Sequence, residues 1–205
     1  MDKYFINIGR QLGSGGKLIG QMLAKELNIP IYDRTLIDMA AQESGLCKEV
    51  FERKDEEKGI ISRLFDIIPF MGDNNMYGSC LSDEALFKIQ SDVIRHLSEK
   101  GSCIFVGRCA DYILRDEPHT LNIFITANDE DRITRIRERH PHFTEEQART
   151  FMQKADQKRA SYYNYYSPGT WGEAKTYDLC INSSLLGLEG TMQFIKMYLE
   201  RMIMK

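Results

Sequence analysis

Short apolar runs alternate along the chain with longer stretches in which apolar residues recur every three to four positions. Five of the short runs are rich in β-branched and aromatic residues and predict strands at residues 4–8, 29–32, 103–106, 121–126 and 178–181. Several are apolar at consecutive positions, which is typical of strands buried on both faces of a parallel sheet. Strands that alternate with helical stretches predict an α/β fold with helices on both sides of that sheet.

The helical stretches show which side chains share a face. The predicted faces are Leu18, Met22, Leu23 and Leu27; Leu36, Met39 and Ala40; Val93, Ile94 and Leu97; and Leu188, Met192, Ile195, Met197 and Leu199. Two stretches interrupt the alternation. Residues 45–82 predict a helical insertion with a loop over the carboxyl edge of the sheet, near an acceptor site. Residues 127–172 predict a basic and aromatic helical region without strands.

Length and composition indicate one domain over residues 1–205. Hydrophobic residues make up 42% and charged residues 28%, which excludes a disordered or low-complexity chain. A net charge of −3 argues against nucleic-acid binding through a global positive field. The five cysteines form no C-x-x-C pair, and no apolar run is long enough to span a membrane. We therefore expect a cytoplasmic protein with neither nucleic-acid nor membrane partners.

The strongest local signal is the glycine-rich segment 8–17, Ile-Gly-Arg-Gln-Leu-Gly-Ser-Gly-Gly-Lys, between the first predicted strand and the first predicted helix. Glycines let a loop curl with its N–H groups inward, and a helix N-terminus adds partial positive charge, so the segment predicts a phosphate site. The candidate ligands are Gly13, Ser14, Gly15, Gly16 and Lys17. The match to G-x-x-x-x-G-K-[ST] is partial, because Gln11 and Leu18 stand at its first glycine and its hydroxyl. An ordinary helix-capping turn is the alternative.

Three further blocks follow in order: 31–34 (Ile-Tyr-Asp-Arg), 105–108 (Phe-Val-Gly-Arg) and 156–159 (Asp-Gln-Lys-Arg) with the tyrosines after it. Together with the loop, they resemble the cytidylate kinase-like branch of the P-loop nucleoside monophosphate kinases. The resemblance spans most of the chain. It implies a three-layer P-loop fold with a central parallel five-stranded sheet, ATP at the loop, Mg²⁺, and a phosphate acceptor, such as a nucleotide, across the carboxyl edge. It also implies a helical lid at residues 127–172.

The resemblance also distributes roles among the candidate residues. Lys17, Arg135 and Arg159 would act on the transferring phosphate, and Arg132 and Arg139 would join the loop in binding ATP. The acceptor would be held by Asp33, Arg108, Asp111 and Asp156. With no hydroxyl after Lys17, Asp33 is also the candidate magnesium ligand.

Each of these assignments has a structural alternative. The lid arginines fall at i, i+3 and i+7 of one helix, where they could pair with neighbouring acids in solvent instead. Asp156 and Arg159 could form a structural pair, Asp33 could cap a helix, and Arg108 could brace a helix N-terminus. The tyrosines at 162, 163, 165 and 166 could stack on a base or pack within the protein.

Three functions fit the sequence. The first is an ATP-dependent kinase of a nucleoside monophosphate, cytidylate by resemblance, although Met152 stands where the family carries a nucleotide-contacting arginine. The second is a kinase of a non-nucleotide metabolite on the same fold. The third is a nucleotide-binding regulatory module with little turnover, which the absent hydroxyl at Leu18 favours. The identity of the acceptor and the oligomeric state are left open.

Overall fold

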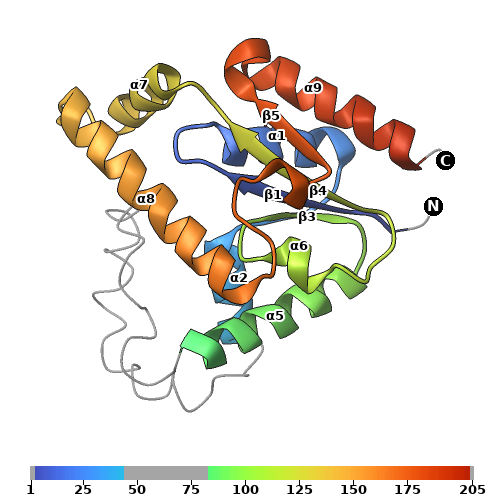
Figure 1. Ribbon diagram of the computed structural model, residues 1–205. Coiled ribbons are helices and arrows are strands. Elements are labelled where there is room, and N and C mark those ends of the chain that lie inside the picture. Colours follow the sequence, from blue (N-terminus) through green and yellow to red (C-terminus); the bar gives the residue numbers. More distant parts are fainter. Residues whose placement is uncertain (1–2, 44–82, 204–205) are drawn as a thin grey trace. The chain divides into compact units, whose positions relative to one another are not determined.

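The computed structural model describes residues 3–43 and 83–203 (Figure 1). The chain divides into two compact units. The first comprises Met1–Arg34 and Leu97–Lys205 and contains the sheet, and the second comprises Thr35–His96. The insertion predicted at residues 45–82 lies outside the described residues.

Five parallel strands form one sheet, which confirms the predicted fold class. They are β1 (Phe5–Arg10), β2 (Ile31–Tyr32), β3 (Cys103–Val106), β4 (Thr120–Thr126) and β5 (Leu179–Asn182), in the spatial order β2-β3-β1-β4-β5. Phe5 stands opposite both Cys103 and Thr120, so β1 is the central strand. The glycine-rich segment that follows β1 therefore leaves the sheet in the middle of its carboxyl edge.

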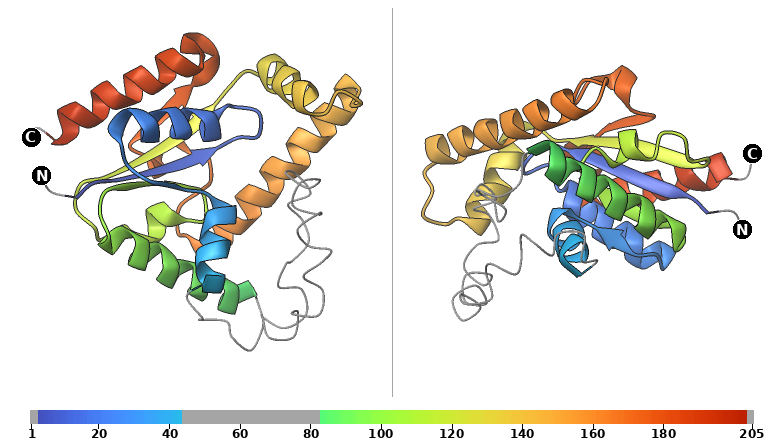
Figure 2. Two further views of the ribbon diagram at one scale, coloured as in Figure 1. Left: turned by 180° about the vertical axis from the view of Figure 1, so that it is seen from behind. Right: turned by 90° about the horizontal axis from the view of Figure 1, so that it is seen from below.

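Helices α1 (Gly16–Leu27) and α9 (Ser183–Ile203) lie side by side against one face of the sheet (Figures 1 and 2). Alternate strand residues such as Ile6 and Ile8 pack there against Leu23 of α1 and Ile195 of α9. Because successive strand residues point to opposite faces, the intervening Phe5 belongs to the other side, where it is also buried. Burial on both faces explains the continuous apolar runs in the sequence.

The buried face of α1 differs from the predicted one. Leu18 is 39% exposed, whereas Ile19 and Gly20 are buried. A Cβ at residue 20 would lie 3.0 Å from Cδ1 of Ile31 and 3.1 Å from Cδ1 of Ile8. The helix therefore approaches the sheet most closely at a glycine, which the hydrophobic pattern does not count.

Helices α7 (Asp129–Arg139) and α8 (Glu145–Tyr166) form a contacting pair after β4, and the 3₁₀ helix η2 (Ala174–Thr176) follows them (Figure 1). Thr144 starts α8 with a capping box, in which its hydroxyl accepts from the Gln147 N–H and the Gln147 side chain accepts from the Thr144 N–H. Ile133 and Ile136 of α7 and Met152 of α8 are buried. The strand-free helical region predicted at residues 127–172 is present.

A short helix, α6 (Ala110–Ile113), follows β3 in the first unit. The second unit contains most of α2 (Arg34–Glu43) and of α5 (Asp83–Glu99). There, Nε2 of Gln90 donates to Oδ1 of Asp38 at 2.7 Å, and both side chains are buried. A hydrogen-bonded polar pair therefore joins α2 to α5.

Candidate active site

The glycine-rich segment curls between β1 and α1. Gly13 and Gly15 both have φ of +78°, a left-handed conformation that favours glycine. The Ser14 hydroxyl donates to the carbonyl oxygen of Gln11 at 2.9 Å and closes the turn. The first N–H groups of a helix have no partner one turn earlier, so the start of α1 at Gly16 adds donors at the same point. The loop therefore has the geometry of an anion site.

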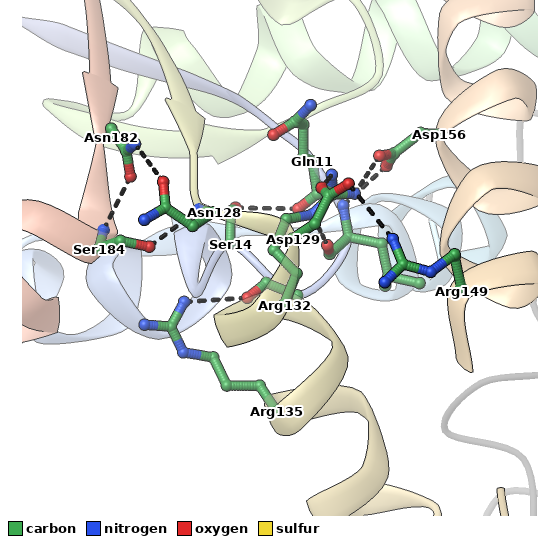
Figure 3. Close-up of polar contacts among 12 residues, drawn as sticks. Gln11, Ser14, Asn128, Asp129, Arg132, Arg135, Arg149, Asp156, Asn182 and Ser184 are labelled. Carbon is green, nitrogen blue, oxygen red and sulfur yellow. Dashed lines mark hydrogen bonds and ion pairs between the residues drawn. The ribbon is translucent and has the colours of Figure 1, made fainter. Parts of the chain in front are cut away.

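Side chains of two helices, α7 and α9, hold the outside of the loop, and Figure 3 shows the two arginines of α7. Carbonyl oxygens of three successive loop residues accept hydrogen bonds, from Arg132 Nε to Leu12 at 2.7 Å, from Arg135 Nη1 to Gly13 at 3.0 Å, and from Ser183 Oγ to Ser14 at 2.7 Å. The main chain of β4 adds a bond, from the N–H of residue 11 to the carbonyl oxygen of residue 125 at 3.1 Å. Because these carbonyl groups point out of the loop and accept hydrogen bonds there, the N–H groups of the loop are favoured to face inward.

Arg132 and Asp156 form a buried ion pair beside the loop (Figure 3). The Arg132 side chain is 4% exposed and also donates to Asp129 at 3.1 Å. Asp156 uses its other oxygen to accept from the N–H of Leu12 at 2.7 Å. Burial raises the pKa of the Asp156 carboxyl, against the opposite effects of the Leu12 N–H and of Arg132. In this structure Arg132 braces the loop, a geometry that the helical spacing of the arginines did not indicate.

Lys17 and Asp33 meet at the carboxyl edge. Nζ of Lys17 lies 2.6 Å from Oδ2 of Asp33, which follows β2. The lysine side chain is 58% exposed and the aspartate side chain only 15%. The sequence predicted both residues for the site, but not their pairing.

Arg159 approaches the start of the loop from α8. Its Nη1 donates to the carbonyl oxygen of Arg10 at 3.3 Å and lies 3.7 Å from Oδ1 of Asp156. Burial lowers the pKa of Arg159, while the Asp156 carboxylate acts in the opposite direction. The predicted Asp-x-x-Arg pair thus contacts the loop through both members.

Arg108 lies on a strained turn after β3. Gly107, Arg108 and Cys109 have successive φ values of +80°, +60° and +54°, which only the glycine adopts easily. The guanidinium carbon of Arg108 lies 5.0 Å from the ring centroid of Tyr162, in a cation–π contact. The backbone strain and the tyrosine together fix the direction of this arginine.

Asp111 and the tyrosines lie next to this turn. The Tyr163 hydroxyl donates to Oδ2 of Asp111, and burial raises the pKa of both groups. The Tyr166 ring contacts those of Tyr162 and Tyr165, at centroid distances of 4.9 Å and 4.8 Å, whereas Tyr163 contacts Asp111 and Tyr177 instead. Arg139 is exposed at the last residue of α7, about one turn beyond Arg135. Its predicted role with ATP stays a prediction.

Sequence reasoning missed Arg10, the last residue of β1. A Cβ at residue 107 would overlap Nη1 of Arg10, and a Cβ at residue 16 would lie 2.7 Å from its Cβ. Burial and the nearby Arg159 and Arg108 lower the pKa of Arg10 to about 9, although Asp33 and Asp156 act in the opposite direction. Its position inside the glycine-rich segment 8–17 was the signal in the sequence that could have identified it.

The described residues contain no cluster of three or more His, Cys, Asp or Glu side chains that could hold a metal ion. Among these same residues, no helix has the length and apolar content that crossing a bilayer requires.

A comparison with known protein families agrees with the order of the four sequence blocks and with the curled loop. The model of the cytidylate kinase-like family matches residues 5–185. The chain belongs to this family. None of the curated proteins compared with the chain matches it.

Several solved structures are similar to this chain over nearly its whole length. An uncharacterized protein from Eubacterium ventriosum ATCC 27560 has 28% identity and a TM-score of 0.74, with 97% of this chain and 99% of that chain covered. Shikimate kinase from Bacteroides thetaiotaomicron has 14% identity, a TM-score of 0.54 and coverage of 97% and 99%. A gluconokinase from Sinorhizobium meliloti 1021 has 12% identity, a TM-score of 0.53 and coverage of 98% and 97%. At these last identities the likeness shows the P-loop kinase fold alone.

Proposed function

We propose that this protein is an ATP-dependent phosphotransferase that acts on a small-molecule acceptor, with a nucleoside monophosphate of the cytidylate type as the first candidate. The observation that carries the proposal is the curled loop of residues 13–16 at the end of the central strand, with Lys17 directly after it. Family membership supports the same reaction class. The shikimate kinase and gluconokinase share only the fold, so a metabolite acceptor is the alternative substrate class.

In this proposal the donor phosphates lie on the inward N–H groups of the loop. Lys17 would exchange its contact with Asp33 for the β- and γ-phosphates, and Arg135, already at the loop, would add a second cation. Magnesium in such sites takes one or two carboxylates together with phosphates and water, and the partly buried Asp33 fits that requirement. When bound, the ion would neutralise developing phosphate charge.

Transfer itself requires positioning and charge neutralisation. An acceptor oxygen forms a bond to the γ-phosphorus while the bond to the β–γ bridging oxygen breaks, and ADP leaves with the electron pair. A phosphate acceptor has its attacking oxygen mostly deprotonated at neutral pH, so no strong base is needed. Arg159 at the loop would stabilise the transferring group, and Arg108 would hold the acceptor. Asp156 would act by holding the loop through Leu12 and Arg132.

A nucleotide-binding module with little turnover is the second candidate. One specific observation favours it: residue 18, where P-loop enzymes carry a magnesium-binding hydroxyl, is a leucine at the start of α1.

The test is release of ADP in a coupled assay with ATP, Mg²⁺ and a panel of nucleoside monophosphates, shikimate and gluconate. We expect turnover with at least one acceptor and a loss of about 100-fold or more in Lys17→Ala, the scale seen when one preorganised donor is removed. The matched control is Lys25→Ala, an exposed lysine in the last turn of the same helix. ATP binding without turnover on any acceptor would favour the module, and equal turnover in both variants would refute the role of the loop lysine.

A further inference from the structure

The turn after β3 holds two consecutive non-glycine residues in the left-handed conformation. Arg108 and Cys109 have φ of +60° and +54°, whereas residues with a side chain normally adopt this conformation singly. Such strain persists only where the surrounding structure over-determines it. Helix α6 begins directly after these two residues, and its Asp111 lies three residues beyond Arg108. The conformation of this turn therefore depends on contacts that other elements make with it.

Two adjacent tyrosines of α8 make such contacts. The Tyr162 ring centroid lies 5.0 Å from the guanidinium carbon of Arg108. The Tyr163 hydroxyl donates to Oδ2 of Asp111, and Tyr163 is only 7% exposed. The ring of Tyr163 also lies near that of Tyr177, at a centroid distance of 6.2 Å, which restricts the direction of its hydroxyl. The side chains of Arg108 and Asp111 therefore both end on the same helix.

The same helix also contacts the glycine-rich loop. Asp156 accepts from the N–H of Leu12 at 2.7 Å, and Arg159 donates to the carbonyl oxygen of Arg10 at 3.3 Å. Asp156, Arg159 and Tyr163 are spaced i, i+3 and i+7, so they share one face of α8. The first and the last are about 10 Å apart along the helix axis. One continuous helix thus connects the loop to the turn after β3.

We propose that the hydrogen bond from Tyr163 to Asp111 is a latch that fixes the turn after β3 on α8, and that these two residues are positioning residues for Arg108. The inference rests on the proposed function, in which Arg108 holds the acceptor. The sequence predicted Asp111 as a ligand of the acceptor itself. In the latch it acts through Tyr163 and needs no charge, only an oxygen that accepts a hydrogen bond. A misplacement of about 1 Å can cost 100-fold in rate, so losing the latch would impair use of the acceptor.

The kinetic test compares Tyr163→Phe, Asp111→Ala and the double variant on the acceptor that wild type uses fastest. We expect each single variant to lower kcat/KM for the acceptor roughly 10- to 100-fold, with KM for ATP within about twofold of wild type. The double variant should be no worse than either single one, because both changes remove the same hydrogen bond. Asp111→Asn keeps an accepting oxygen and should stay within about threefold of wild type. Tyr165→Phe, which removes the hydroxyl of a tyrosine that is 69% exposed on the same helix, is the matched control.

The pattern among these variants separates the latch from direct contact with the acceptor. If Asp111→Asn is as impaired as Asp111→Ala while Tyr163→Phe resembles wild type, Asp111 acts on the acceptor through its charge and the latch is overturned. Equal kcat/KM in wild type and all variants overturns the positioning role as well.

A second measurement does not depend on turnover. Hydrogen–deuterium exchange with mass spectrometry on the ligand-free protein follows the backbone hydrogen bonds within residues 107–114. In Tyr163→Phe we expect these residues to exchange about 10-fold faster by local opening, while residues 5–10 of β1 are unchanged. Asp111→Asn and Tyr165→Phe should match wild type. Unchanged exchange in Tyr163→Phe overturns the latch. If wild type uses no acceptor but Tyr163→Phe shows the faster exchange, the proposed function fails while the latch between α8 and the turn is supported.

Discussion

The carboxyl group of Asp111 makes protein stability depend on pH in a defined direction. Burial raises its pKa, and the hydrogen bond from Tyr163 only partly offsets this. Between the ordinary pKa and the raised one, the folded state binds more protons than the unfolded state, so this group's contribution to stability falls as pH rises. Asp111→Asn has no proton to lose. We therefore predict that the variant gains stability relative to wild type on going from pH 4 to pH 7.

Urea unfolding of both proteins at pH 4, 5, 6 and 7 measures this difference. Asp116→Asn, at an exposed aspartate, is the control and should show a nearly constant offset. A constant offset for Asp111→Asn would contradict the prediction, because it would mean that the carboxyl titrates alike in the folded and unfolded states.

At this scale the sequence identified residue types better than their partners. Lys17 and Asp33 were both predicted for the site, because one follows a glycine-rich loop and the other follows a strand. Their contact at 2.6 Å, like the pairing of Arg132 with Asp156, joins segments far apart in the sequence, and local periodicity carries no information on such pairs. Arg10 was missed for the same reason, since only the fold brings it to Gly107.

Helix α7 contacts the glycine-rich loop through two arginines, and Arg132 is the buried one. Arg132 contacts Leu12, Asp129 and Asp156, and its side chain is 4% exposed. Without Arg132, Asp156 would keep only the longer contact with Arg159 and the hydrogen bond from Leu12, and removing one partner of a buried ion pair costs about 3–5 kcal/mol. We predict a loss of this size for Arg132→Ala in urea unfolding, together with weaker binding of ADP because the loop loses its brace.

Arg137→Ala is the matched control for this prediction. It removes an exposed arginine from the same helix, whose side chain, among the described residues, donates only to the carbonyl oxygen of Phe143. We expect a change within about 0.5 kcal/mol, as for most surface substitutions. If both variants unfold at the same urea concentration, Arg132 is not a structural brace, and a direct role with phosphate becomes the better explanation.

The elements themselves were largely predictable. All five strands lie within two residues of their predicted ranges, because continuous β-branched runs are a strong local signal. Helix faces were predicted less well: Leu18 is exposed and Met197 is 52% exposed, whereas Gly20 lies against the sheet. Hydrophobic periodicity favours large side chains, and it cannot detect a face that packs closely through a glycine.

In the sheet-containing unit, the strand order explains why distant residues share one site. β1 is central, so the loop after it has the ends of β3 and β4 on either side. Helices α7 and α8 follow β4 and return to the loop through Arg132, Arg135 and Asp156. α9 reaches the same loop through Ser183. Among the described residues, this short segment of main chain adjoins β1 and α1 and is hydrogen-bonded to β4, α7, α8 and α9.

This arrangement predicts that nucleotide binding reaches beyond the loop. At 100 times its Kd, ADP adds about 2.7 kcal/mol to stability, so amides that exchange only by global unfolding should slow about 100-fold. Amides of α7 exchange by local opening unless the helix is tied to the loop. Because Arg132 and Arg135 bond to loop carbonyls, we expect ADP to slow exchange in α7 as well as in residues 11–18. Hydrogen–deuterium exchange with mass spectrometry measures both. In Arg132→Ala the loop should still be protected while protection of α7 falls; protection of the loop alone in wild type would show that the two are uncoupled.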